Sequence, residues 1–201
     1  MVVIGHFGSV TALPASRIYR DRKVLFLVPG SSHPALCDMT QGTTLRFFGS
    51  GDGQIACLDS AATLTSSALL LAQRGNYGER LGRALFQRLT ATAKNARILY
   101  LKPDSPTSPS RLVANHNLIY LCGSQEFSMR FAANLWFRPG TTCVFSDDAY
   151  TAALHMPPPC THVYVAFLSM GRRHRNRSVA CNVIGLSNPL ARQAAGAVFS
   201  D

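Results

Sequence analysis

The segment from Ala68 to Lys102 constrains the fold more than any other part of the sequence. It begins with the apolar run from Ala68 to Ala72, turns at a stretch rich in glycine and arginine, and continues with a helical pattern from Glu79 to Asn95. One face of that helix is apolar, and its residues are Leu81, Leu85, Phe86, Leu89 and Ala93. A second strand-like run, Arg97 to Leu101, follows. This segment therefore predicts a strand, a turn, an amphipathic helix and a second strand.

Short apolar runs elsewhere predict further strands. The expected strands are Lys23 to Val28, Thr43 to Phe48, Gln54 to Leu58, Phe127 to Phe137, Thr141 to Phe145, His162 to Leu168 and Ser178 to Leu186. The glycine-rich stretch from Gly49 to Gly53 is typical of a hairpin loop. Leu112 to Cys122 fits a helix or a strand equally well. Helices are expected from Asp147 to His155, where a proline run ends the pattern, and from Asn188 to Phe199, with Asn188 as N-cap.

These elements predict an α/β fold built on a mixed, mostly antiparallel sheet around the central strand–turn–helix–strand unit. We expect a core domain of residues 1–140 and a basic C-terminal β/α extension of residues 141–201 packed on that core. The 201 residues, 47% of them hydrophobic, are enough for a continuous core. Six widely spaced cysteines without a CxxC pair are expected to be reduced thiols.

Charge and hydropathy limit the partners that the chain is expected to bind. The formal net charge of +10 favours polyanions. No apolar run approaches the roughly 20 residues that span a bilayer, so we expect a soluble protein without a membrane partner. A secretory signal is not evident. The expected compartment is therefore intracellular, cytoplasmic or nuclear, and a mitochondrial location stays open.

The turn before the central helix has the features of an anion-binding site. Gly75 and Gly78 would bring backbone N–H groups to the start of the helix, and three arginines lie nearby: Arg74, Arg80 and Arg83. The first N–H groups of a helix lack intrahelical partners and the helix dipole is positive there, which favours a phosphate.

The same residues resemble the acetyl-coenzyme A loop of the GNAT N-acetyltransferase family. Gln73-Arg74-Gly75 is similar to one end of that loop, and the run from Leu81 to Phe86, which contains Gly82, is similar to the other. The resemblance implies a GNAT-like fold and an acyl-coenzyme A-dependent N-acyltransferase, in which an amine on a protein or a small-molecule substrate attacks acetyl-coenzyme A directly.

The resemblance also implies roles for individual residues. The cofactor would be held by Gln73, Arg74, Gly75, Gly78, Arg80, Gly82 and Arg83. Tyr120 would be the general acid that protonates the leaving thiolate, and Asp59 or Glu79 would be the general base.

A second hypothesis is a non-enzymatic basic protein that binds nucleic acid, for instance a viral or ribonucleoprotein component. Its contact would be the arginine-rich loop between two predicted strands, through Arg172, Arg173, Arg175 and Arg177. A zinc site is not predicted, because the histidines and cysteines from His155 to Cys181 match no standard ligand spacing.

Overall fold

The structure is a computed structural model. It describes residues 1–38, 42–47, 51–61, 67–91, 95–102, 104, 110–135, 137–149, 162–170 and 179–185. The chain divides into two compact units. Unit 1 contains Met1–Gln54 and Leu168–Cys181, and unit 2 contains Ile55–Phe167 and Asn182–Asp201. The units are described one at a time.

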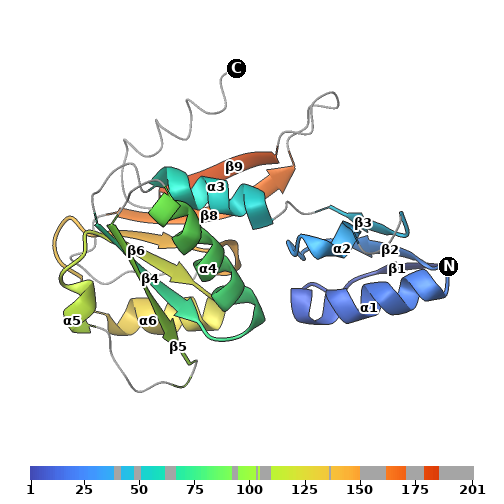
Figure 1. The fold of residues 1–201 in the computed structure, drawn as a ribbon, viewed down its shortest axis with the longest axis horizontal. Helices are drawn as coiled ribbons and strands as arrows, with labels where there is room; N and C mark the ends of the chain where they lie inside the picture. Colours follow the sequence, from blue (N-terminus) through green and yellow to red (C-terminus); the bar gives the residue numbers. More distant parts are fainter. Residues whose placement is uncertain are drawn as a thin grey trace. The chain divides into compact units, whose positions relative to one another are not determined.

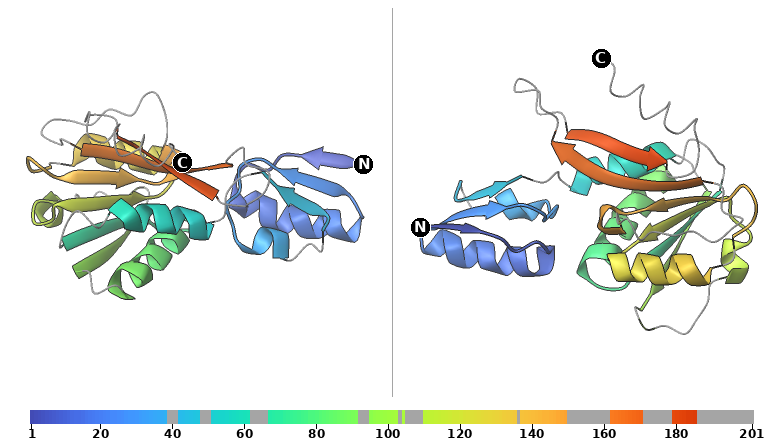
Figure 2. Two further views of the ribbon diagram at one scale, coloured as in Figure 1. Left: turned by 90° about the horizontal axis from the view of Figure 1, so that it is seen from above. Right: turned by 180° about the vertical axis from the view of Figure 1, so that it is seen from behind.

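Unit 1 contains a three-stranded parallel sheet with the order β1-β2-β3. Its elements follow one another as β1 (Val2–Ile4), α1 (Ser9–Asp21), β2 (Leu25–Val28), α2 (Ala35–Asp38) and β3 (Thr44–Arg46). Both helices lie on the same side of the sheet (Figure 2). Connections between parallel strands are almost always right-handed, so two crossovers that step in one direction place their helices on one face.

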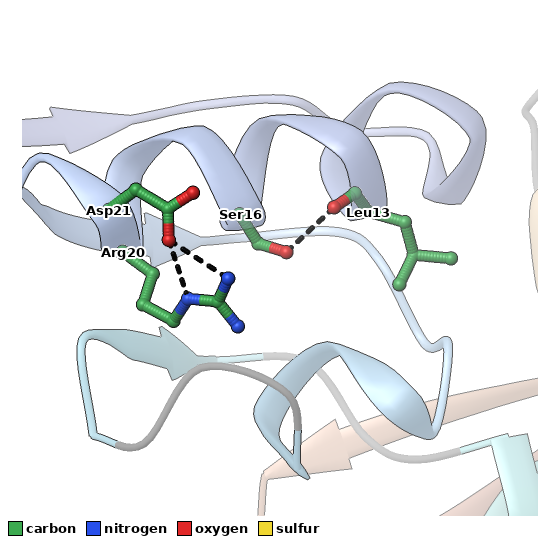
Figure 3. A network of polar contacts seen from close by, with 4 residues as sticks. All are labelled: Leu13, Ser16, Arg20 and Asp21. Atoms are coloured by element: carbon green, nitrogen blue, oxygen red, sulfur yellow. Dashed lines mark hydrogen bonds and ion pairs between the residues drawn. The ribbon is translucent and has the colours of Figure 1, made fainter.

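The core of unit 1 lies between that face and the helices. Ala12 from α1, Leu36 from α2 and Phe26 and Val28 from β2 are fully buried there. Polar groups of α1 are paired locally: the Ser16 hydroxyl donates to the Leu13 carbonyl oxygen at 2.8 Å, and Arg20 pairs with Asp21 at 2.9 Å (Figure 3).

Unit 2 contains a six-stranded sheet with the order β5-β4-β6-β7-β8-β9, in which every pair from β5 to β8 is parallel. Its strands are β4 (Ser67–Gln73), β5 (Asn95–Leu101), β6 (Leu118–Cys122), β7 (Thr142–Phe145), β8 (His162–Met170) and β9 (Val179–Gly185). Its helices are α4 (Asn76–Ala91), α5 (Ser110–Val113) and α6 (Gln125–Asn134), with a 3-10 turn, η2, at Asp147–Ala149. A further helix, α3 (Gly51–Ala61), precedes β4 and spans the boundary between the units.

Helices cover both faces of the unit 2 sheet, because the chain winds in both directions. It steps from β4 to β5 through α4, then returns past β4 to β6 and continues to β7 through α6. Figure 1 shows α3 and α4 on one face, and the view from behind in Figure 2 shows α6 on the other. Accordingly Leu70 and Leu71, which point to opposite faces of β4, are both fully buried.

Four sequence-based predictions about the fold are wrong. The sheets are parallel and not mostly antiparallel. Where we expected a hairpin loop from Gly49 to Gly53 and a strand from Gln54 to Leu58, residues 51–61 form α3. The strand expected over Phe127 to Phe137 is instead α6, whose first turn is capped by the Ser124 hydroxyl, accepting from the Phe127 N–H.

The central segment is confirmed as strand, turn, helix and strand, with the helix beginning at Asn76 and not at Glu79. The strands expected around β2, β3, β7, β8 and β9 are also present. Leu112 to Cys122, which fitted either type, contains the end of α5 and all of β6. Most of the helix expected from Asp147 and all of the helix expected from Asn188 lie outside the described residues. The division between residues 140 and 141 stays a prediction.

Candidate functional site

The candidate site lies where β4, β6 and β7 end, at the carboxyl edge of the unit 2 sheet. The direction of winding reverses between β4 and β6, which are neighbours in the sheet although β5 lies between them in the chain. In open parallel sheets, ligands bind outside the carboxyl ends of the strands at such a switch point. Two helices, α4 and α6, begin at this edge directly after β4 and β6.

Gln73 fills the crevice between β4 and β6. Its side-chain carbonyl oxygen accepts a hydrogen bond from the Ser124 N–H at 2.7 Å, so the first amide before α6 is already paired. Cβ atoms added at Gly78 and Gly123 would lie 2.8 Å and 2.9 Å from the Gln73 Cβ, so both glycines pack against this side chain. The crevice is therefore closed by the protein itself.

Ser146 joins β7 to the loop after β6. Its buried hydroxyl donates to the Gly123 carbonyl oxygen at 2.8 Å, and the Gly123 N–H donates to the Ser146 hydroxyl oxygen at 3.4 Å. Together with the Gln73 contact, this pairing fixes the loops that follow the three strands.

Tyr77 and the carboxylates after β7 form the polar part of the edge. Tyr77 lies in the first turn of α4, and its hydroxyl donates to Asp147 Oδ1 in η2. Asp147 and Asp148 are both partly buried. Burial, and secondarily the charge of Asp147, raise the pKa of Asp148 from 3.8 to about 6. The two adjacent carboxylates are partly desolvated and repel each other, so a cation beside them would be favoured.

Two of the glycines assigned to cofactor binding, Gly78 and Gly82, lie where α4 approaches the sheet closely. A Cβ at Gly78 would lie 2.5 Å from the Cys122 carbonyl oxygen, and one at Gly82 would lie 2.6 Å from the Ala72 Cβ. Gly75 has a φ of +119°, which the turn requires.

The charged residues of the predicted cofactor loop lie around the start of α4. Glu79 pairs with Arg83 at 2.9 Å and accepts from the Gly75 N–H at 3.4 Å, so an acidic side chain already occupies this helix start. Arg74 and Arg83 are exposed, and Arg80 is partly buried.

Two predicted catalytic residues have structural partners away from the carboxyl edge. Tyr120 lies inside β6, fully buried, and its hydroxyl donates to the Leu58 carbonyl oxygen at 2.7 Å. Burial raises its pKa far above the ordinary value. Asp59 in α3 pairs with Arg88 in α4 at 2.8 Å. Glu79 alone of the three lies near the carboxyl edge. The catalytic and cofactor-binding assignments themselves stay predictions.

The other predicted sites have a mixed outcome. Arg172, Arg173, Arg175 and Arg177 lie outside the described residues. Within the described part of the chain, no group of histidine, cysteine or acidic residues has the arrangement of a metal site, and no helix there is long and apolar enough to cross a membrane. Of the six cysteines expected to be reduced, the structure describes the side chains of Cys122 and Cys143, and both are buried and form no disulfide. Burial raises the pKa of Cys122 to about 12, which makes its thiol unreactive.

Sequence reasoning missed Tyr77, Ser124, Ser146 and Asp147 as site residues. A signal was available, because each follows a strand of the parallel sheet by only one to four residues. Polar side chains directly after parallel strands meet at one edge. The expected antiparallel sheet placed consecutive strand ends at opposite edges and hid this pattern.

The fold is similar to that of solved substrate-binding proteins. A leucine-binding protein LivK from Thermotoga maritima aligns with a TM-score of 0.63 and 15% identity over 98% of this chain and 55% of that one. A solute-binding protein of an ABC transporter from Rhodopseudomonas palustris, solved with 3,4-dihydroxybenzoic acid, aligns with a TM-score of 0.61 and 13% identity over 98% and 54%. An ABC transporter substrate-binding protein from Desulfitobacterium hafniense, solved with Leu, gives 0.59 and 16% over 87% and 53%.

The chain thus spans about half the length of the solved proteins that it matches. No protein-family model matches it, and no curated protein matches it by sequence.

These findings correct the functional predictions made from the sequence. The resemblance to GNAT acetyltransferases is wrong, because the chain has a parallel-sheet fold like that of substrate-binding proteins. The acyltransferase function, the acetyl-coenzyme A cofactor and the alternative nucleic-acid-binding function are wrong by the same finding. The motif does not distinguish the GNAT fold from this parallel-sheet fold, because a strand, a glycine turn and a helix occur in both. Here Gly78 and Gly82 serve helix packing.

Proposed function

We propose that this protein binds a free amino acid at the carboxyl edge of the unit 2 sheet. The observation that carries the proposal is the arrangement of Tyr77, Asp147 and Asp148 beside the start of α4. Since Gln73 closes the crevice between β4 and β6, the ligand would lie toward β6 and β7, where these side chains are.

Charge favours a ligand with an ammonium group. A cation beside Asp147 and Asp148 would offset the repulsion between their carboxylates, and hydrogen bonds to charged groups contribute about 1.5 to 3 kcal/mol each. The Tyr77 hydroxyl holds Asp147 in place and could itself face the ligand. The similar fold of proteins solved with Leu or named for leucine supports an amino acid as the ligand class.

Isothermal titration calorimetry with L-leucine tests the proposal, and 4-methylpentanoate is the matched ligand that lacks only the ammonium group. We expect leucine to bind at least about tenfold more tightly than 4-methylpentanoate. Asp147→Asn should remove most of this difference, because the neutral amide no longer attracts the ammonium group. The control is Asp52→Asn, which neutralises an exposed aspartate of α3.

Equal affinity for the two ligands would contradict the role of the carboxylates. No heat with leucine or with any other neutral or aromatic amino acid at millimolar concentration would contradict the proposed function as a whole.

A further inference from the structure

Gln73 carries a side-chain amide at the candidate site, and the protein uses only one side of this amide. The carbonyl oxygen accepts from the Ser124 N–H at 2.7 Å. Since that partner is a donor, the atom that faces it must be the oxygen, and the planar amide holds its NH₂ group on the other side. Among the described residues, no side chain or carbonyl oxygen accepts a hydrogen bond from this NH₂ group. The half-buried Gln73 therefore keeps a free donor at the carboxyl edge.

The close contacts of Gln73 place it beside the segments that form the candidate site. A Cβ added at Gly123 would lie 2.9 Å from the Gln73 side-chain oxygen, and one at Gly78 would lie 2.8 Å from the Gln73 Cβ. Gly78 lies in the first turn of α4, and Gly123 pairs with Ser146, the residue before Asp147. The Gln73 side chain thus contacts both the start of α4 and the loop that is joined to the carboxylate pair.

The two helix starts at this edge are poor alternatives for binding a ligand carboxylate. Each has an acidic residue in its first turn, Glu79 in α4 and Glu126 in α6. Glu79 also accepts from the Gly75 N–H at 3.4 Å. Because an acidic side chain offsets the positive end of the helix dipole, a further carboxylate is attracted less strongly. The neutral Gln73 amide offers a donor without this repulsion.

An amino acid carries its ammonium group and its carboxylate on one carbon atom, so the protein groups that bind them must be close neighbours. Asp147 and Asp148 would attract the ammonium group but repel the carboxylate. We propose that the free NH₂ group of Gln73 donates a hydrogen bond to the carboxylate of the bound amino acid. This inference rests on the proposed function and adds to it the group that distinguishes an amino acid from a simple amine.

Calorimetric titration with L-leucine and with 3-methylbutylamine tests the inference, because this amine is leucine without its carboxylate. The measured quantity is the ratio of the two dissociation constants, amine over leucine. Gln73→Glu keeps the side-chain length and the acceptor for the Ser124 N–H, which favours the ionised form. It replaces the NH₂ donor with a second carboxylate oxygen. We expect this variant to lower the ratio at least about tenfold.

Gln73→Met separates the loss of the donor from the repulsion that a new charge adds, because the methionine side chain has a similar length and neither an N–H group nor a charge. We expect it to lower the ratio about tenfold, since the hydrogen bond to a charged group is lost. Both ligands bind to the same variant, so a general loss of stability cancels in the ratio. The matched control is Gln87→Glu, which adds a charge at an exposed position of α4 and should leave the ratio unchanged.

A ratio that falls in Gln73→Glu but not in Gln73→Met would overturn the inference, because repulsion at a distance would then explain the result. So would a ratio that neither variant changes, or one that Gln87→Glu lowers equally. Failure of both ligands to bind the unsubstituted protein would instead contradict the proposed function, and the inference with it.

Discussion

Units 1 and 2 are built from the same kind of element, yet among the described residues only unit 2 covers both faces of its own sheet. Unit 1 steps in a single direction from β1 to β3 and covers one face. Unit 2 steps from β4 to β5 and then back to β6 and β7, which covers both faces. The reversal has a second consequence, since it creates the switch point at which we place the ligand. The direction of winding thus accounts both for the exposed apolar side chains on the unit 1 sheet, such as Ile4 and Leu45, and for the candidate site of unit 2.

Large-to-small substitutions should show this difference most strongly. Leu70→Ala and Leu71→Ala, on opposite faces of β4, should each lower the free energy of unfolding by about 2 to 5 kcal/mol, because both side chains are fully buried. In unit 1, Phe26→Ala should cost about 3 to 5 kcal/mol, whereas Leu45→Ala on the exposed face should cost under about 1 kcal/mol. Urea unfolding measures these values. Similar losses for Phe26 and Leu45 would contradict the one-sided cover of unit 1.

The close approach of α4 to the unit 2 sheet gives the next largest effect. Gly82→Val should destabilise the protein by about 2 to 3 kcal/mol, because the added side chain meets Ala72. Gln87→Val introduces the same side chain at an exposed position of the same helix and should cost only about 0.5 kcal/mol. The comparison uses thermal and urea unfolding. Equal losses would mean that helix propensity, and not packing, sets the need for glycine.

The carboxylate pair of unit 2 predicts a dependence of stability on pH. The pKa of Asp148 is raised in the folded state, so this residue contributes most to stability below pH 4, and its contribution falls as the pH rises to about 6. Allowing for partial exposure, the change should be about 1 to 2 kcal/mol. Asp148→Asn should flatten the plot of unfolding free energy against pH between pH 4 and 6. An unchanged slope of this plot in the variant would show that the folded state does not raise the pKa of Asp148.

The smallest expected effect concerns the closed crevice. Gln73→Ala removes the acceptor of the Ser124 N–H and should cost about 1 kcal/mol, because a partly buried donor loses its partner. Hydrogen exchange at the Ser124 amide should become faster, while Gln87→Ala should leave it unchanged. Retained protection in the Gln73 variant would mean that another group closes the crevice.

Part of this fold could be predicted from the sequence because local patterns determine it. The apolar period of α4 and the flanking runs identified β4, α4 and β5. Strand direction depends on contacts between distant residues. Still, the runs of β4 and β6 are apolar without alternation, which is typical of parallel strands covered on both faces.

The helix α6 was missed because two periods overlap in it. Phe127, Phe131 and Leu135 are four residues apart, as in a helix, but with Met129 they also alternate as in a strand. The N-cap Ser124 and the acidic Glu126 in the first turn were the signals that favoured a helix.

The site was predicted only in part. Gln73 was named as a cofactor-binding residue, and the structure shows its side chain between β4 and β6, where it accepts from the Ser124 N–H. The contact of Tyr77 with Asp147 joins residues 70 positions apart, and only the sheet order brings them together.

The most direct measurement follows the backbone amides of isotope-labelled protein by NMR during titration with L-leucine. We predict that the shifts concentrate at residues 74–77, 123–125 and 146–149, after β4, β6 and β7, and that they vanish with 4-methylpentanoate at the same concentration. Saturable shifts elsewhere in the chain, with these three segments unchanged, would contradict a ligand site at the carboxyl edge of the unit 2 sheet.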